Sequence, residues 1–226
     1  TNPQYFVARE DESHKERCTK FTMRNVPGDG DCMFLAVALA AATSMGLGGN
    51  DELLRGISRE TREIVAQVLS SEGKLYIGEG NIVDASTLLE AAVKLEPSTN
   101  TTEAYLKALR TEGRNGGLYG GGPELAVLSN VLRRPISIYE ADYDRLKHQG
   151  NSEKQNSNNT EASSEVLFPI VCKGSFGEGI FEDPCLSSVP DSVFSSTMQL
   201  GAYSWRLHIL VLDVSATEKH ACVLLP

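Results

Sequence analysis

The chain has 226 residues, of which 41% are hydrophobic and 23% are charged, and its formal net charge is −9. This composition is typical of a globular domain and excludes the collagen-like, disordered and membrane classes. The negative charge disfavours nucleic acid as a partner, because proteins that bind the phosphate backbone usually carry a basic stripe. We therefore expect one monomeric domain that binds neither nucleic acid nor a membrane.

The cysteines fit neither a disulfide framework nor a zinc site, because their number is odd and none of them forms a CxxC pair. They are Cys18, Cys32, Cys172, Cys185 and Cys222. Reduced thiols are usual inside the cell, so we expect a cytoplasmic or nuclear protein.

Residues 1–20 are dense in charge and lack apolar periodicity, which predicts a solvated N-terminal arm before a domain over 21–226. Asp31 is followed by the run CMFLAVALAAATSMGLGG, whose strong helix formers end in a glycine cluster. We expect one buried helix here. Further helices are predicted where apolar residues recur at helical spacing or where proline marks a helix start, over 51–70, 84–95, 102–110 and 123–132.

Strand-like patterns dominate the second half of the chain, at 136–139, 166–172, 205–214 and 220–225. The last two are expected to form a β-hairpin. Between the first two of these strands, residues 142–165 are almost free of aliphatic side chains and predict a polar, flexible insertion. Early helices and late strands indicate a single α+β domain with a central β-sheet covered by helices.

Cys32 stands at the start of the predicted buried helix, directly after the sequence GDGD. A helix N-terminus carries partial positive charge, which favours a thiolate over a thiol. Gly28 and Gly30 allow a tight turn whose amide groups are able to face a developing oxyanion. Cys32 is therefore the candidate nucleophile, and Asp29 lies in the same turn.

A cysteine nucleophile needs a base within hydrogen-bonding distance. His14 lies in the charged arm and His148 in the polar insertion, where nothing fixes their geometry. His208 lies mid-strand, which favours a structural role. His220 follows a polar turn and begins an apolar strand, so it is the preferred base.

Three segments, in this order, resemble the ovarian-tumour (OTU) family of cysteine proteases: GDGDCMF at 28–34, YGGGPELAVLSNVLRRPISIYE at 119–140 and LHILVLDVSATEKHACVL at 207–224. The resemblance implies that Cys32 is the nucleophile and His220 the general base. It also implies that the Asp29 loop helps to build the oxyanion hole. The implied activity is hydrolysis of isopeptide bonds at the C-terminal glycine of ubiquitin, polyubiquitin chains or a ubiquitin-like modifier, with no metal or organic cofactor.

Two positions depart from the family pattern. Tyr119 stands where tryptophan is common, and Cys222 stands where an Asp or Asn usually orients the histidine. Strand alternation places residue 222 on the same face as His220. Either Cys222 orients His220 weakly, or another acceptor does so, such as Asp213 if the hairpin register permits it.

Cys222 also supports two alternatives to an active hydrolase. A ubiquitin-binding pseudoenzyme would keep the fold without turnover. A redox sensor would instead form a disulfide between Cys32 and Cys222. Linkage preference and modifier choice depend on surface contacts that the sequence does not specify.

Overall fold

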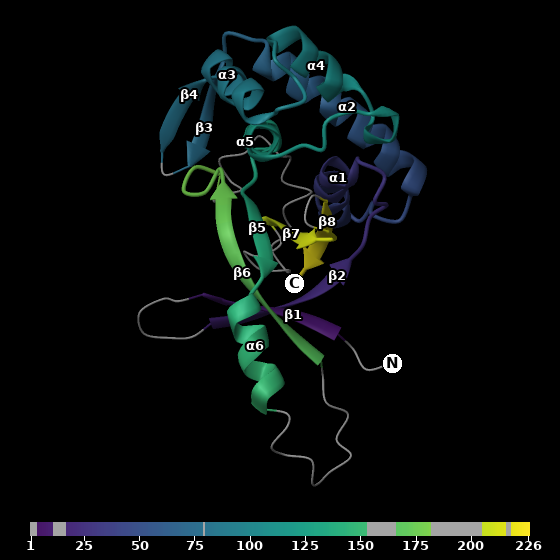
Figure 1. Ribbon diagram of the computed structural model, residues 1–226, viewed down its shortest axis with the longest axis vertical. Helices are drawn as coiled ribbons and strands as arrows, with labels where there is room; N and C mark the ends of the chain where they lie inside the picture. The colour runs from purple at the N-terminus through teal and green to yellow at the C-terminus, as the bar shows by residue number, and fades with distance from the viewer. Residues whose placement is uncertain (1–3, 11–16, 79, 153–165, 182–204, 216–217) are drawn as a thin grey trace.

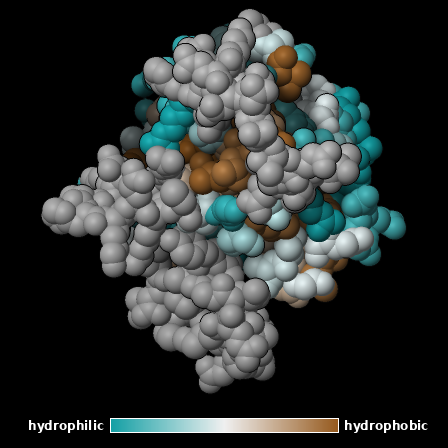
Figure 2. Space-filling model, turned by 90° about the horizontal axis from the view of Figure 1, so that it is seen from below, coloured by the Kyte–Doolittle hydropathy of each residue, from teal (hydrophilic) through white to brown (hydrophobic). Residues whose placement is uncertain are grey.

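The computed structural model describes residues 4–10, 17–78, 80–152, 166–181, 205–215 and 218–226. Within these ranges, no helix combines the length and the apolar character that crossing a membrane requires. Seen from below, the coloured part of the surface has a patch of apolar side chains near its centre and polar side chains on its right (Figure 2).

Six strands form one closed sheet in the order β1-β2-β8-β7-β5-β6. Their bounds are β1 Gln4–Glu10, β2 Arg17–Arg24, β5 Ile136–Ala141, β6 Val166–Phe176, β7 Leu207–Asp213 and β8 Lys219–Leu225. The β1–β6 and β5–β7 pairs are parallel, and the other pairs are antiparallel. The expected hairpin of β7 and β8 is therefore present, with His220 opposite Leu212.

The helices gather on one side of this sheet, together with a small hairpin of β3 and β4 (Figure 1). Their bounds are α1 Cys32–Ser44, α2 Asp51–Leu69, β3 Lys74–Gly78, β4 Asn81–Asp84, α3 Ala85–Leu95, α4 Thr102–Arg110, η1 Gly113–Asn115 and α5 Gly122–Leu132. A further helix, α6 Tyr143–Ser152, lies at the opposite end of the molecule (Figure 1). The expected α+β class, with a sheet covered by helices, is confirmed.

Helix α1 lies between the sheet and the other helices (Figure 1). Ten of its 13 residues are buried, and it is apolar on every side, as a helix enclosed by protein must be. On its sheet side it meets β8 residues such as Ala221 and Val223, which belong to the same buried cluster. A second cluster fills the inside of the closed sheet and includes Phe21, Leu210 and Cys222. Alternation along β8 thus divides the strand between the two clusters.

Two expectations about chain organisation are wrong. The predicted solvated arm over 1–20 contains β1 and the first part of β2, because the charges nearby hid the short apolar run of residues 5–8. The predicted flexible insertion over 142–165 begins with α6. That helix is held by local polar contacts, since Asp142 accepts a bond from the Arg145 N–H and forms an ion pair with its side chain. Residues 153–165 lie outside the described ranges.

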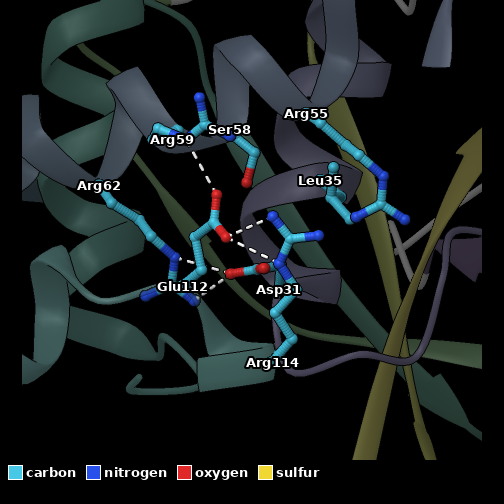
Figure 3. A pocket seen from close by; sticks show the side chains of 8 residues that line it. All are labelled: Asp31, Leu35, Arg55, Ser58, Arg59, Arg62, Glu112 and Arg114. Carbon is cyan, nitrogen blue, oxygen red and sulfur yellow. Dashed lines mark hydrogen bonds and ion pairs between the residues drawn. The ribbon is translucent and has the colours of Figure 1, made fainter. Parts of the chain in front are cut away.

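A buried ion pair joins the loop before α1 to helix α2. The Arg62 side chain is fully buried, and its guanidinium donates to Asp31 Oδ1 from Nε at 2.8 Å and forms an ion pair through a second nitrogen at 2.6 Å. It also donates to the backbone carbonyls of Leu109, Leu118 and Gly30 at 2.9–3.3 Å. Next to this buried pair, Glu112 forms ion pairs with two further arginines, Arg59 and Arg114, whose side chains are exposed (Figure 3).

The Arg62 guanidinium also lies 4.2 Å from the centre of the Phe34 ring. Its charge is therefore compensated by a carboxylate, three carbonyl groups and an aromatic face. Desolvation of two charges is costly, so such a pair adds little net stability, but removal of one partner leaves the other uncompensated. Arg62 consequently fixes the position of the 30–31 loop relative to residues 109–118.

We predict that Arg62→Met lowers the free energy of unfolding by about 3–5 kcal/mol, because it leaves the Asp31 carboxylate buried without its cation. Urea denaturation followed by circular dichroism measures this change. The matched control is Arg110→Met, which breaks a pair with Glu63 in which both side chains are about 40% exposed. That change should cost less than about 1 kcal/mol. Equal losses in the two variants would contradict the role assigned to Arg62.

Candidate active site

A cleft of about 760 Å³ lies where the N-terminus of α1 meets the turn between β7 and β8. Its lining includes Cys32 and His220, which are far apart in the sequence. Asp29 does not line it but belongs to the loop that forms one wall. The remaining lining residues come from that loop, from Tyr119 and from the β7–β8 turn: Asn25, Val26, Gly28, Gly30, Asp213, Val214, Ser215, Glu218 and Lys219.

The loop before Cys32 is held by a close approach of two glycines. Gly30 has φ +85°, and a Cβ on it would lie 2.8 Å from the backbone of Gly113. A Cβ on Gly113 would lie even closer to the Gly30 backbone. The Gly113 N–H donates to Asp31 Oδ1 at 2.9 Å, which locks the two segments together. Only glycine at both positions permits this contact.

Cys32 is the first residue of α1, and its side chain is buried at the inner end of the cleft. The first turn of α1 contains no acidic side chain that would offset the positive end of the helix dipole. The Cys32 sulfur therefore lies at the positive end of the α1 dipole, at the helix start that the sequence predicts.

Tyr119 lies beside Cys32 in the same cleft. Burial, and next the neighbouring Cys32 and Cys222 sulfurs, raise the pKa of the Tyr119 hydroxyl above its ordinary value. The hydroxyl is therefore protonated at neutral pH. Its oxygen is buried and has no nitrogen or oxygen partner among the described residues, so the neutral Tyr119 O–H faces the Cys32 sulfur, with which it interacts.

The Asp29 carboxylate is directed away from the thiol and towards α2. Its Oδ2 accepts a bond from Arg55 at 2.9 Å, and its Oδ1 accepts the Asp31 N–H at 3.4 Å. Burial opposes ionisation of this carboxyl, but the bonds from Arg55 and Asp31 outweigh burial and hold its pKa below the ordinary range. Asp29 is therefore ionised at neutral pH and acts on the shape of the loop, not as a proton donor.

His220 is partly exposed at the start of β8, and both edges of its ring have neighbours. Its Nε2 lies 2.7 Å from Asn25 Oδ1. The opposite edge faces the Cys32 loop, because a Cβ on Gly28 would lie 3.5 Å from His220 Nδ1. One ring nitrogen thus contacts Asn25, and the other points towards the loop that carries the thiol.

Asn25 is a site residue that the sequence analysis missed. Its Oδ1 also lies 3.1 Å from the Val26 N–H and 3.3 Å from Cys222 Sγ. Asn25 follows β2 directly, and β2 pairs with β8 through Arg24 opposite Val223. That pairing was the signal needed to find it, but the sequence did not predict β2 as a strand.

Cys222 lies on the same face of β8 as His220, as strand alternation predicts, since both contact Asn25. Burial, and next the charge of Cys32, raise the pKa of the Cys222 thiol to about 11. Cys222 is thus an S–H group at neutral pH. Asp213 is opposite Lys219 in the hairpin and lies 3.8 Å from its ammonium. The register therefore places Asp213 on the face away from His220, and the suggestion that it orients the imidazole is wrong.

The other histidines do not enter the cleft as far as the structure describes them. His208 is buried inside the closed sheet, where its Nδ1 lies 3.0 Å from the Tyr139 hydroxyl. This agrees with the structural role expected for it. His14 and the side chain of His148 lie outside the described residues, as do Cys185 and the side chain of Cys18.

Comparison with known proteins identifies the family. The model of the OTU-like cysteine protease family matches residues 27–176, roughly two thirds of the chain. This match includes Cys32 and Tyr119, and it ends before His220.

The chain is 26% identical over 135 residues to an Arabidopsis thaliana protein named OVARIAN TUMOR DOMAIN-containing deubiquitinating enzyme 3. The aligned region covers 60% of this chain and 52% of that protein, so the chain spans about half the length of this relative.

Two solved structures align over 91% of the chain. One is the viral OTU domain protease from Dera Ghazi Khan virus, with 16% identity, 82% coverage of that chain and a TM-score of 0.41. The other is the Hazara virus OTU bound to ubiquitin, with 17% identity, 80% coverage of that chain and a TM-score of 0.42. The family model alone matches more than half of the sequence and includes the loop that builds the cleft. The chain therefore belongs to the OTU-like cysteine protease family.

Proposed function

We propose that the protein is a thiol-dependent deubiquitinase that hydrolyses isopeptide bonds after the C-terminal glycine of ubiquitin or a ubiquitin-like modifier. The observation that carries the proposal is that Cys32, at a helix N-terminus, and His220, on the last strand, line the same cleft. Nucleophile and base in one cleft are what acyl transfer by a cysteine enzyme needs.

In the proposed reaction, the Cys32 thiolate attacks the carbonyl carbon of the terminal glycine. Amide groups of the 29–32 loop stabilise the oxyanion. The Asp31 N–H is directed at Asp29, so we assign this role to its neighbours in the loop. His220 gives its proton to the departing lysine amine, which leaves a thioester on Cys32. His220 then takes a proton from water, which attacks the thioester and regenerates the thiolate and the imidazolium.

Support for ubiquitin as the partner comes from the name of the plant relative, which calls that protein a deubiquitinating enzyme. The cleft chemistry is compatible with this partner. Ubiquitin ends in an extended, arginine-containing tail. The cleft is lined by the carboxylates of Asp213 and Glu218 and by the Lys219 ammonium, which lies 3.8 Å from Asp213. Opposite charges across a binding site favour the correct partner. We propose that the reaction needs no metal or organic cofactor. We also propose that the protein acts in the cytoplasm or nucleus.

The alternative of a ubiquitin-binding pseudoenzyme is disfavoured by Asn25. That alternative depends on Cys222, which stands where the family usually has an orienting Asp or Asn. The bond of 2.7 Å between His220 Nε2 and Asn25 Oδ1 supplies such a partner from another strand. This bond supports the proposal of an active hydrolase over that of a pseudoenzyme.

We predict that a ubiquitin probe with a C-terminal electrophile forms one covalent adduct, at Cys32, because among the thiols that the structure describes this one lies at a helix N-terminus and lines the cleft with His220. Intact-protein mass spectrometry measures the adduct. Cys32→Ala should abolish it, and Cys172→Ala, which removes an exposed thiol, should leave it unchanged. An adduct that survives Cys32→Ala sinks the assignment, and binding without an adduct supports the pseudoenzyme.

We predict that His220→Ala lowers kcat by at least about 100-fold, the lower range for loss of a general acid–base group. The matched control is His208→Gln, which keeps an amide near Tyr139 and should retain most of kcat. Hydrolysis of a ubiquitin–lysine conjugate is followed at a temperature where thermal melts show both variants folded. Comparable losses in the two variants would leave the base unassigned.

We predict that Asp29→Ala lowers kcat roughly tenfold, because the loop loses the acceptor for the Asp31 N–H and the amides lose their alignment. Asp29→Asn keeps that acceptor and should stay within about threefold of the parent, although its bond to Arg55 is weaker. Steady-state kinetics on the same conjugate compare the two. An equal, large loss in both would show that the carboxylate charge matters more than the loop geometry.

A further inference from the structure

We infer that Asn25 is the positioning residue of His220, and that Cys222 serves as a hydrogen-bond donor that fixes the Asn25 amide. The inference rests on the proposed roles of Cys32 and His220. It assigns to a residue after β2 the task that a residue two positions after the histidine usually performs in this family.

Three donors converge on one atom of Asn25. The Val26 N–H lies 3.1 Å, His220 Nε2 2.7 Å and Cys222 Sγ 3.3 Å from Asn25 Oδ1. A backbone N–H can only donate, so the atom at this point is the amide oxygen. An amide oxygen can only accept, and His220 Nε2 must therefore carry a proton.

This protonation fixes the chemistry of the opposite ring nitrogen. When the neutral imidazole holds its proton on Nε2, the lone pair is on Nδ1. Nδ1 is the nitrogen that faces the loop of Cys32, as its closeness to Gly28 shows. Asn25 thus selects the tautomer in which His220 is able to take the thiol proton.

Cys222 is unsuited to this task and suited to a different one. A thiol is a weak acceptor, and the Cys222 thiol is protonated at neutral pH because burial raises its pKa to about 11. Its S–H is directed at Asn25, not at the imidazole. The third candidate, Asp213, lies on the opposite face with Lys219. Asn25 is therefore the acceptor that the described residues offer to Nε2.

The sheet holds Asn25 in this place. Pairing of Arg24 with Val223 brings the end of β2 alongside β8, and the next residue along the chain reaches Cys222 and His220. Val26 is buried, which anchors the chain on the other side of Asn25. Asn25 itself is exposed at the rim, so water competes for its bonds and the expected effect is moderate.

The experiment compares Asn25→Ala, Asn25→Asp and the double variant Asn25→Ala/Cys222→Asn. For Asn25→Ala we expect kcat to fall roughly tenfold while KM stays within about twofold, because tautomer choice affects chemistry more than binding. The double variant should recover part of kcat, since residue 222 is next to the imidazole. Asn130→Ala is the matched control, because Asn130 also bonds to backbone groups but on α5, and kcat should be unchanged.

A second readout does not depend on ubiquitin. The rate at which iodoacetamide alkylates Cys32, resolved by peptide mapping and measured against pH, reports the thiolate. The titratable groups around the imidazole are Cys32, Tyr119, Asp213, Glu218, Lys219 and Cys222. Asn25→Asp adds a carboxylate that favours the charged imidazolium of His220. The change in alkylation rate that accompanies loss of the imidazolium proton should therefore move to higher pH. Asn25→Ala should instead slow alkylation at neutral pH.

The outcomes separate the two proposals. If the parent protein hydrolyses no ubiquitin conjugate but the alkylation profile responds to Asn25 as expected, the proposed function fails and the positioning role stands. If Asn25→Asp is folded and its alkylation profile matches the parent, Asn25 does not act on the imidazole. Unchanged kcat in Asn25→Ala would overturn the inference equally, and a failure of Asn25→Ala to fold leaves the Asp variant to decide.

Discussion

Arg62 is fully buried in the helical half of the molecule, and its donors bind one carboxylate and three backbone carbonyl groups. Two of these acceptors, Gly30 and Asp31, belong to the loop before Cys32. The other two flank the turn that brings Gly113 against Gly30. Each of these acceptors must lie within hydrogen-bonding distance of the buried guanidinium. This requirement defines the mutual position of the segments more sharply than apolar packing does. Cys32, the proposed nucleophile, is thus positioned by a charge that does not line the cleft.

The same constraint extends to Tyr119 through helix α1. The Phe34 ring has Arg62 at 4.2 Å, and a Cβ on Gly120 would lie 2.7 Å from the same ring. Gly120 therefore needs its positive φ of +86° and its missing side chain. The adjacent Tyr119 is held over the sulfur as a result. Glu124 closes the arrangement, because its carboxylate accepts the Gly121 N–H at 2.7 Å and a bond from the buried Tyr105 hydroxyl.

Local patterns in the sequence predicted the parts of the fold that they specify. The apolar run from Cys32, the amphipathic pattern of α2 and the turn signals around α4 and α5 gave helices close to those observed, and the hairpin carrying His220 was expected correctly. The strands β1 and β2 were missed because their apolar residues are few and lie among charges. Their stability comes from partners distant in the chain, such as β6 and β8, and no local pattern reports such pairing. Helix α6 was missed for a related reason, since side-chain charges and not an apolar stripe hold it.

That gap explains why the sequence pointed to Cys32 and His220, which share the cleft, and not to Asn25. A nucleophile at a helix start and a histidine at a strand start each have a local signature. An acceptor for the imidazole has only a spatial requirement: its oxygen must lie about 2.7–3.2 Å from Nε2. In a sheet where β8 has β2 as its neighbour, that requirement is met equally well from residue 222 or from the end of β2. Once Asn25 occupies the position, a carboxylate at 222 would meet an amide oxygen, whereas the Cys222 thiol donates to it. The departure from the family pattern at 222 and the presence of Asn25 are thus two parts of one hydrogen-bond arrangement, and neither residue can be interpreted without the other.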